Sequence, residues 1–185
     1  YKNGACSMQF NPIPDAYAEN GWSTATETAV VVDGNGYAID GLCQIGSSSF
    51  GFVNAESKPL TISNVTFTNA YVNATGSNDV GVVAGKAGGN VTIKNVKVEN
   101  ATVIGAANVG GFVGNAVGLV DVQNSSFDGN VTGSDAAVVG GLVGYAYASS
   151  LKIQKSFLTG DVAKGAYVGG FVGRIENGNA DGSKV

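Results

Sequence analysis

The side chains that could do chemistry in this chain are carboxylates, tyrosines and one arginine, because the sequence contains no histidine. That absence removes His-based catalytic triads, His metal sites and an imidazole general base. The remaining option is carboxylate chemistry, and a glycosidase of that kind needs two acids about 5–10 Å apart on one face. Asp121, Asp128 and Asp161 fall at different positions of the repeat described below. We therefore predict no catalytic residue and no enzyme.

A metal site has one weak candidate. Asp79 and Asp135 lie near the same corner of the repeat, which leaves a calcium site there as an alternative. The chain lacks the glycine–aspartate nonapeptide that calcium-binding solenoids repeat. We predict no metal site and no cofactor.

Aromatic residues gather at one place, formed by Tyr145, Tyr147 and Tyr167. The aligned repeats place no acid beside these rings, and Arg174 has no carboxylate near it on the same face. Aromatics clustered beside carboxylates would favour a carbohydrate-binding or carbohydrate-acting protein. That function therefore stands as the alternative and not as the leading interpretation.

The two cysteines, Cys6 and Cys43, predict a disulfide between the N-terminal segment and the first repeat. Such a bond indicates an oxidising compartment. The alternative is a pair of buried free thiols, since cysteine is among the most buried residue types.

Asparagines occur in more Asn-x-Ser/Thr patterns than chance would place, which makes them candidate N-glycosylation sites in a secreted protein. They are Asn64, Asn73, Asn90, Asn100, Asn124 and Asn130. Asn73 and Asn130 are the better candidates because they lie by corners. Asn64, Asn95 and Asn124 share one repeat position, where stacked amides could instead form an internal hydrogen-bonded ladder.

A glycine-broken segment recurs along the chain. It reads VGVVAG at 80–85, VGGFVG at 109–114, VVGGLVGY at 138–145 and VGGFVG at 168–173. One valine of this motif recurs as Val80, Val109, Val139 and Val168, at intervals of 29, 30 and 29 residues. A fixed interval of this length is the signature of a repeat architecture.

The segments between these repeats alternate apolar and polar residues, as strands do. When they are aligned, like residues fall in columns, such as Leu60, Val91, Val120 and Leu151. Another column holds Asn69, Asn100, Gly129 and Gly160, the residue types that accept a left-handed backbone at least cost. The pattern predicts an all-β fold, a parallel β-solenoid (right-handed β-helix) of about five coils of about 30 residues.

The domain organisation predicted is an irregular N-terminal cap at 1–28 and solenoid repeats at 29–185, forming one domain. The chain opens at Tyr1 without a signal peptide, so we expect a mature or excised fragment. A net charge of −4 without a basic stripe excludes nucleic acid as a partner. No apolar run reaches the roughly 18 residues that a membrane span needs.

Alternation within the glycine-broken segment leaves two interpretations for Val83, Phe112, Leu142 and Phe171. If the flanking valines fill the core, these four form an apolar stripe on the outer face, a surface for assembly. If the glycine pair makes a bulge, both sets of side chains turn inward.

Two of the repeats, NSSFDGNVTGSDAAVVGGLVG (124–144) and KSFLTGDVAKGAYVGGFVG (155–173), resemble the GLUG motif. GLUG repeats occur in bacterial extracellular adhesin-like proteins, beside IgA-cleaving metallopeptidases and in some protist surface proteins. The resemblance implies a secreted or cell-surface scaffold or adhesive stalk. It brings no catalytic residue.

The leading prediction is therefore an extracellular structural or adhesive module, a stalk or filament subunit without catalysis. Its partners would be other copies of itself, end to end or laterally, or a host or cell-surface protein or glycan. The C-terminal segment shows no apolar cap, so either the solenoid continues in a longer chain or its last coil stacks on a neighbour.

Overall fold

The computed structural model describes residue 6 and residues 29–48, 51–74, 76 and 78–177. These residues form an all-β structure in which every strand pairing is parallel and no helix occurs. The chain winds through five coils, which begin at Val30, Leu60, Val91, Val120 and Leu151. The predicted parallel β-solenoid is confirmed. The predicted cap at 1–28 lies, apart from Cys6, outside the described residues.

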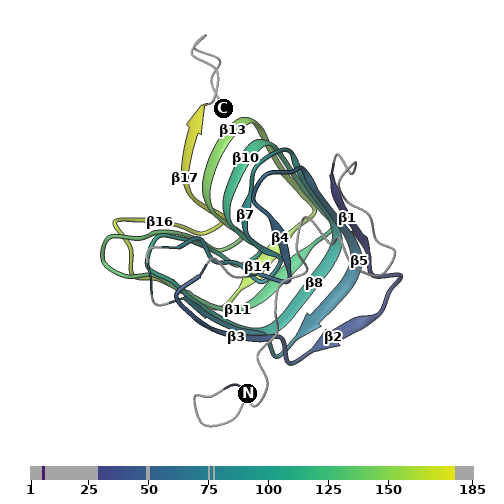
Figure 1. Ribbon diagram of the computed structural model, residues 1–185, viewed down its shortest axis with the longest axis horizontal. Helices are drawn as coiled ribbons and strands as arrows, with labels where there is room; N and C mark the ends of the chain where they lie inside the picture. Colours follow the sequence, from purple (N-terminus) through teal and green to yellow (C-terminus); the bar gives the residue numbers. More distant parts are fainter. Residues whose placement is uncertain (1–5, 7–28, 49–50, 75, 77, 178–185) are drawn as a thin grey trace.

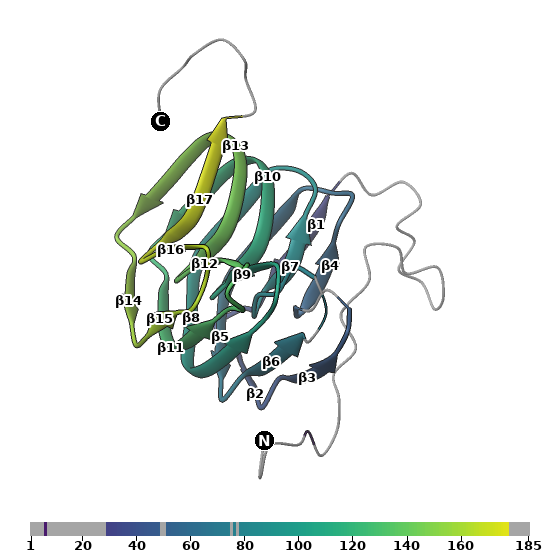
Figure 2. The ribbon, with the colours of Figure 1, turned by 90° about the vertical axis from the view of Figure 1, so that its left-hand side faces the viewer.

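Each coil contributes several short strands or a long strand that bends at the corners. In chain order the strands are β1 (Val30–Asp33), β2 (Ala38–Asp40), β3 (Cys43–Gly46), β4 (Val53–Ala55), β5 (Leu60–Thr68), β6 (Tyr71–Ala74), β7 (Ala84–Ala87), β8 (Val91–Ile104), β9 (Asn108–Gly110), β10 (Val113–Gln123), β11 (Ser126–Thr132), β12 (Val138–Gly140), β13 (Val143–Gln154), β14 (Phe157–Thr159), β15 (Val162–Ala163), β16 (Tyr167–Gly169) and β17 (Val172–Asn177). Figure 1 looks along the stack, so that β7, β10, β13 and β17 follow one another. Figure 2 shows the coils side by side.

The core is built from columns of like residues. Leu60 pairs with Val91 and Ile62 with Ile93, and the register continues to Val120 and Val122 in the next coil. These side chains are fully buried. Alternation sends the residues between them outward, because successive side chains of a strand point to opposite faces. The predicted apolar columns therefore form the interior.

Asparagine and glycine make the corners, as predicted. The backbone is left-handed at Asn69 and Asn100 (φ 54° at both), and Gly129 and Gly160 also have a positive φ (153° and 106°), although a register shift places Gly129 opposite Ala101 and not opposite Asn100. A second left-handed column contains Asn64, Asn95 and Asn124 and ends with Lys155. An asparagine side chain tolerates this conformation better than a branched or bulky one does.

The glycine-broken segment forms a further corner of the coil. Strand β9 ends at Gly110 and β10 begins at Val113, in a different sheet. A Cβ on Gly110 would clash with the carbonyl oxygen of Val113, so the two strands touch backbone to backbone. Only glycine allows that approach.

The same corner corrects the predicted assembly stripe. Val83, Phe112 and Leu142 are fully buried, so they do not form an outer apolar face. The alternative, in which they turn inward, is the arrangement observed, although a corner produces it and not a bulge. The Phe112 ring packs edge to face on Phe127, 6.1 Å between centroids. The fourth residue, Phe171, is 44% exposed because it belongs to the last coil.

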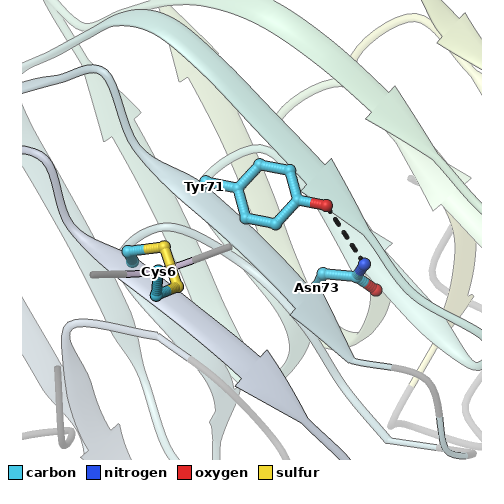
Figure 3. The surroundings of a disulfide bond; sticks show 4 residues. Cys6, Tyr71 and Asn73 are labelled. Atoms are coloured by element: carbon cyan, nitrogen blue, oxygen red, sulfur yellow. Dashed lines mark hydrogen bonds between the residues drawn. A yellow bond between two sulfur atoms is a disulfide. The ribbon is translucent and has the colours of Figure 1, made fainter. Parts of the chain in front are cut away.

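The predicted disulfide between Cys6 and Cys43 is present. Cys43 is buried in β3, and its partner across the parallel pairing is Tyr71 in β6. Figure 3 shows the bond beside Tyr71, whose hydroxyl accepts a hydrogen bond from Asn73 Nδ2 at 3.2 Å. The bond ties Cys6 to the first coil across 37 residues of sequence.

The glycine column at the corner predicts a difference between two matched substitutions. In Gly141→Ala the new Cβ would clash with the carbonyl oxygen of Gly170 in the next coil, whereas the space around a Cβ at Gly170 is open. We expect Gly141→Ala to lower the free energy of unfolding by about 3 kcal/mol. Gly170→Ala should change it by no more than about 0.5 kcal/mol. Urea unfolding followed by circular dichroism measures both, and equal effects would contradict this account of the corner.

Candidate functional site

The glycine corner brings outward-facing side chains from two strands of each coil together. One column contains Asn108, Val138 and Tyr167, on strands β9, β12 and β16. The facing column contains Lys86, Asn115, Tyr145 and Arg174, on strands β7, β10, β13 and β17. In Figure 1 strands β16 and β17 meet at a re-entrant corner of the outline. Outer side chains therefore face each other there, where a convex corner would separate them.

Around strands β9 and β10 this corner is filled by a polar network. Asp79 accepts hydrogen bonds from Asn108 Nδ2 at 2.7 Å and from Asn115 Nδ2 at 3.1 Å. These two asparagines come from β9 and β10, so the carboxylate joins the two strands of the corner. Amide donors occupy both of its oxygens, an arrangement that satisfies the charge with hydrogen bonds.

The last two coils fill the same corner with an aromatic and charged set, here called the corner cluster: Tyr145, Tyr147, Tyr167, Arg174 and Glu176. The Tyr145 hydroxyl donates to Glu176 Oε2 at 2.7 Å. Arg174 forms an ion pair with Glu176, and its guanidinium lies over the Tyr167 ring, 4.9 Å from the centroid. Tyr147 is the cross-strand neighbour of Glu176.

The corner cluster overturns two expectations from the sequence. Arg174 does have a carboxylate beside it, and the tyrosines do have a matching acid, because Glu176 serves both. Glu176 lies after the last glycine-broken segment, which ends at Gly173, so the repeat pattern gives no expectation for it. The signal that could have found it is strand alternation, which places residues two apart on the same face.

Burial and the carboxylate set the acidity of Tyr145. Burial of the phenol and, after it, the hydrogen bond to Glu176 together raise the pKa of Tyr145 to about 12. Both effects oppose formation of a phenolate next to a negative charge. Tyr145 therefore acts as a hydrogen-bond donor that holds Glu176 in place.

Two asparagine ladders run along other corners, at the surface. Asn95 Nδ2 donates to Asn64 Oδ1 at 2.8 Å, and Asn64 Nδ2 donates to Asp33 Oδ1 at 3.0 Å. The stacked amides predicted at this position exist, but they lie on the outside of the solenoid and not in its interior.

The second ladder runs from Asn100 Nδ2 to Asn69 Oδ1 at 2.7 Å and from Asn69 Nδ2 to Asp40 Oδ1 at 2.8 Å. An aspartate of the first coil ends each ladder. The Asn35 backbone amide and the Asn64 side chain lower the pKa of Asp33. Thr68 and Asn69 lower the pKa of Asp40.

The predicted glycosylation sites differ in the hydrogen bonds that their side-chain amides make. The side-chain nitrogens of Asn64, Asn73 and Asn100 each donate a hydrogen bond. Asn90 Oδ1 accepts a hydrogen bond from Leu119 N at 2.9 Å, and Asn130 Oδ1 accepts one from Asp161 N at 3.3 Å. These two residues and Asn124 are exposed.

Within the described part of the chain, no group of three or more cysteine, aspartate and glutamate side chains is placed to hold a metal ion. Asp79 and Asp135 do not make such a site there. The described residues also contain no helix long and apolar enough to cross a membrane.

Comparison with known proteins gives one partial similarity. A segment of 86 residues, 46% of the chain, is 38% identical to halomucin of Haloquadratum walsbyi, and it covers 1% of that protein. No family model matches, so the resemblance to the GLUG motif has no family assignment behind it. No solved structure matches either. The chain is thus a β-solenoid with a distant, partial similarity to halomucin.

The Tyr145–Glu176 hydrogen bond predicts a titration and a pH dependence. One tyrosine should ionise near pH 12, and Glu176→Gln should lower that pKa because the negative charge is lost. Since the pKa is raised on folding, the stability it contributes is complete below pH 10 and is lost between pH 10 and about 12.

The measurement is NMR of ¹³Cζ-labelled tyrosine, with Tyr145→Phe to assign the signal. A Tyr145 signal that titrates near the ordinary tyrosine value of about 10 would contradict the prediction.

Proposed function

We propose that this chain is a structural module of an extracellular or cell-surface protein, a β-solenoid shaft without catalysis of its own. The observation that carries the proposal is the unbroken stack of five coils, whose last coil presents an edge shaped to receive another coil. A shaft of this kind acts through length, rigidity and the surfaces at its ends and sides.

The last coil supports a stacking role by its exposed apolar side chains. Val168, Phe171 and Ile175 are exposed there, whereas Val139, Leu142 and Ala146, at the equivalent positions of the preceding coil, are buried. Next to Gly141, the carbonyl oxygen of Gly170 from the following coil fills the space that a Cβ would need. Next to Gly170 the corresponding space is open. An incoming coil of the same repeat would meet matching columns.

We infer that the coil received is one of another copy of this chain. The buried columns that bind coil to coil within the chain are self-complementary, since apolar residues pair with apolar residues in the core. A contact between the end of one molecule and the start of the next is heterologous, and repeated it builds a filament.

The disulfide and the similarity to halomucin support the location. A bond between Cys6 and Cys43 suits an oxidising environment. The name halomucin belongs to a far longer protein, of which the matched segment is 1%, so its own role is not carried over.

The proposal is tested by measuring assembly of the wild-type chain and of a variant at Gly170, where the space around a Cβ is open. We expect the wild-type chain to form oligomers whose mass rises with concentration in light scattering, and short filaments in negative-stain electron microscopy. Gly170→Ala should leave the monomer folded and prevent assembly, because its Cβ would clash with the incoming coil as one at Gly141 would clash within the chain. Lys94→Ala is the control, because Lys94 is an exposed residue on the side of β8 that an incoming coil would not cover.

A wild-type chain that stays monomeric at every concentration would overturn the end-to-end contact. Assembly that Gly170→Ala leaves unchanged would overturn its placement on the last coil.

Glycosylation of the shaft is part of this proposal. Asn90, Asn124 and Asn130 are the expected sites, because these residues are exposed and do not take part in the two ladders described above. Glycopeptide mass spectrometry of the protein from its natural source should find glycans at these three and none at Asn64, Asn73 or Asn100. Occupancy at Asn64 without occupancy at Asn90 would contradict this order.

A further inference from the structure

We propose that the corner cluster is a binding site for a neutral hexose glycan. The inference goes beyond the shaft function, because it assigns a ligand to the side of the solenoid and not to its end. It rests on the exposed tyrosine rings, the ion pair between them and the re-entrant shape that brings them together.

The aromatic platforms are Tyr147 and Tyr167. Their exposed fractions are 43% and 50%, and they come from strands β13 and β16 on the two sides of the corner. The C–H face of a hexose ring is apolar and flat, and it stacks on an aromatic ring, whose π face is negative. Arg174 packs on the Tyr167 ring and limits its movement.

The polar partners are Arg174 and Glu176. Each of these side chains is about two-fifths exposed, so their outer atoms are accessible to a ligand. A guanidinium donates in a planar fork and a carboxylate accepts with two oxygens, and together they suit neighbouring sugar hydroxyls, which both donate and accept. Tyr145 fixes Glu176 through its hydroxyl, so the acceptor is positioned before a ligand arrives.

Charge favours a neutral ligand over an anionic one. Arg174 is paired with Glu176, so the cluster has no net charge. Lys86, the other cation in the Arg174 column, lies three coils away, and Asn115 and Tyr145 separate them. An acidic polysaccharide or a nucleic acid would meet the Glu176 carboxylate without a surplus of positive charge to offset it.

The cluster stays accessible in an assembled shaft. Its side chains point sideways from the coils, as alternation requires of residues whose neighbours Ala146 and Ala148 are buried. Tyr147 already has a coil on either side and is still 43% exposed, so a coil stacked on the last one would cover the edges of Tyr167, Arg174 and Glu176 and leave their outward faces open. Binding is therefore measured at a concentration at which the chain is monomeric, so that a failure of binding and a failure of assembly are told apart.

Isothermal titration calorimetry with three neutral probes tests the site: cellohexaose, maltohexaose and mannohexaose. We expect the disulfide-bonded chain to bind at least one of them. Tyr147→Ala and Tyr167→Ala should each weaken that binding about tenfold or more, and Glu176→Gln should weaken it as well. Tyr37→Ala is the control, because Tyr37 is 73% exposed on the first coil, away from the cluster. Circular dichroism checks that each variant keeps the wild-type fold.

Three results would overturn the proposal. One is the absence of binding to all three probes at millimolar concentration. Another is binding that the two tyrosine variants leave unchanged, which would place the site elsewhere. The third is tighter binding of polygalacturonate than of any neutral probe. The oligomeric state, measured on the same samples, reports on the shaft function independently.

Discussion

The structure depends on the parallel, in-register pairing of each coil with the next. Hydrogen bonds between coils run from the first strand to the last, so a residue in a paired strand has a neighbour in the next coil about 4.8 Å away. A column must therefore hold residues that tolerate one another at that spacing. Leu60, Val91 and Val120 satisfy this in the core by apolar packing. Asn64 and Asn95 satisfy it at the surface by an amide hydrogen bond.

The same pairing explains the glycine-broken segment. At the corner between β9 and β10 the chain must fold back on itself while each strand keeps its partners in the neighbouring coils. Gly110 gives the backbone contact within the coil, and Gly111 gives room for the Phe127 ring and for the carbonyl of Gly141. A residue with a Cβ would separate the strands and break the columns in several coils at once. Glycine is thus repeated because the constraint is repeated.

The corner that glycine permits also determines the chemistry of the surface. Its outer side chains converge, and in successive coils the position changes from an Asp79 network with two asparagines to a tyrosine, arginine and glutamate cluster. The strands of this corner stay in register from coil to coil, so the side chains give each level its character. A solenoid can in this way carry a local site on a uniform scaffold, as repeat proteins do on their binding faces.

The sequence by itself determined the fold class, the number of coils, the left-handed corners at Asn69 and Asn100, and the pairing of Cys6 with Cys43. These follow from periodicity, from the conformational preference of asparagine and glycine, and from there being two cysteines. Only the tertiary structure decided that Phe112 turns inward, that the asparagine ladders lie outside, and that Glu176 joins Tyr145 and Arg174. The physical reason is that alternation along a strand gives only two opposite faces. Which face is the interior, and which strands face each other, depends on the direction in which each corner bends.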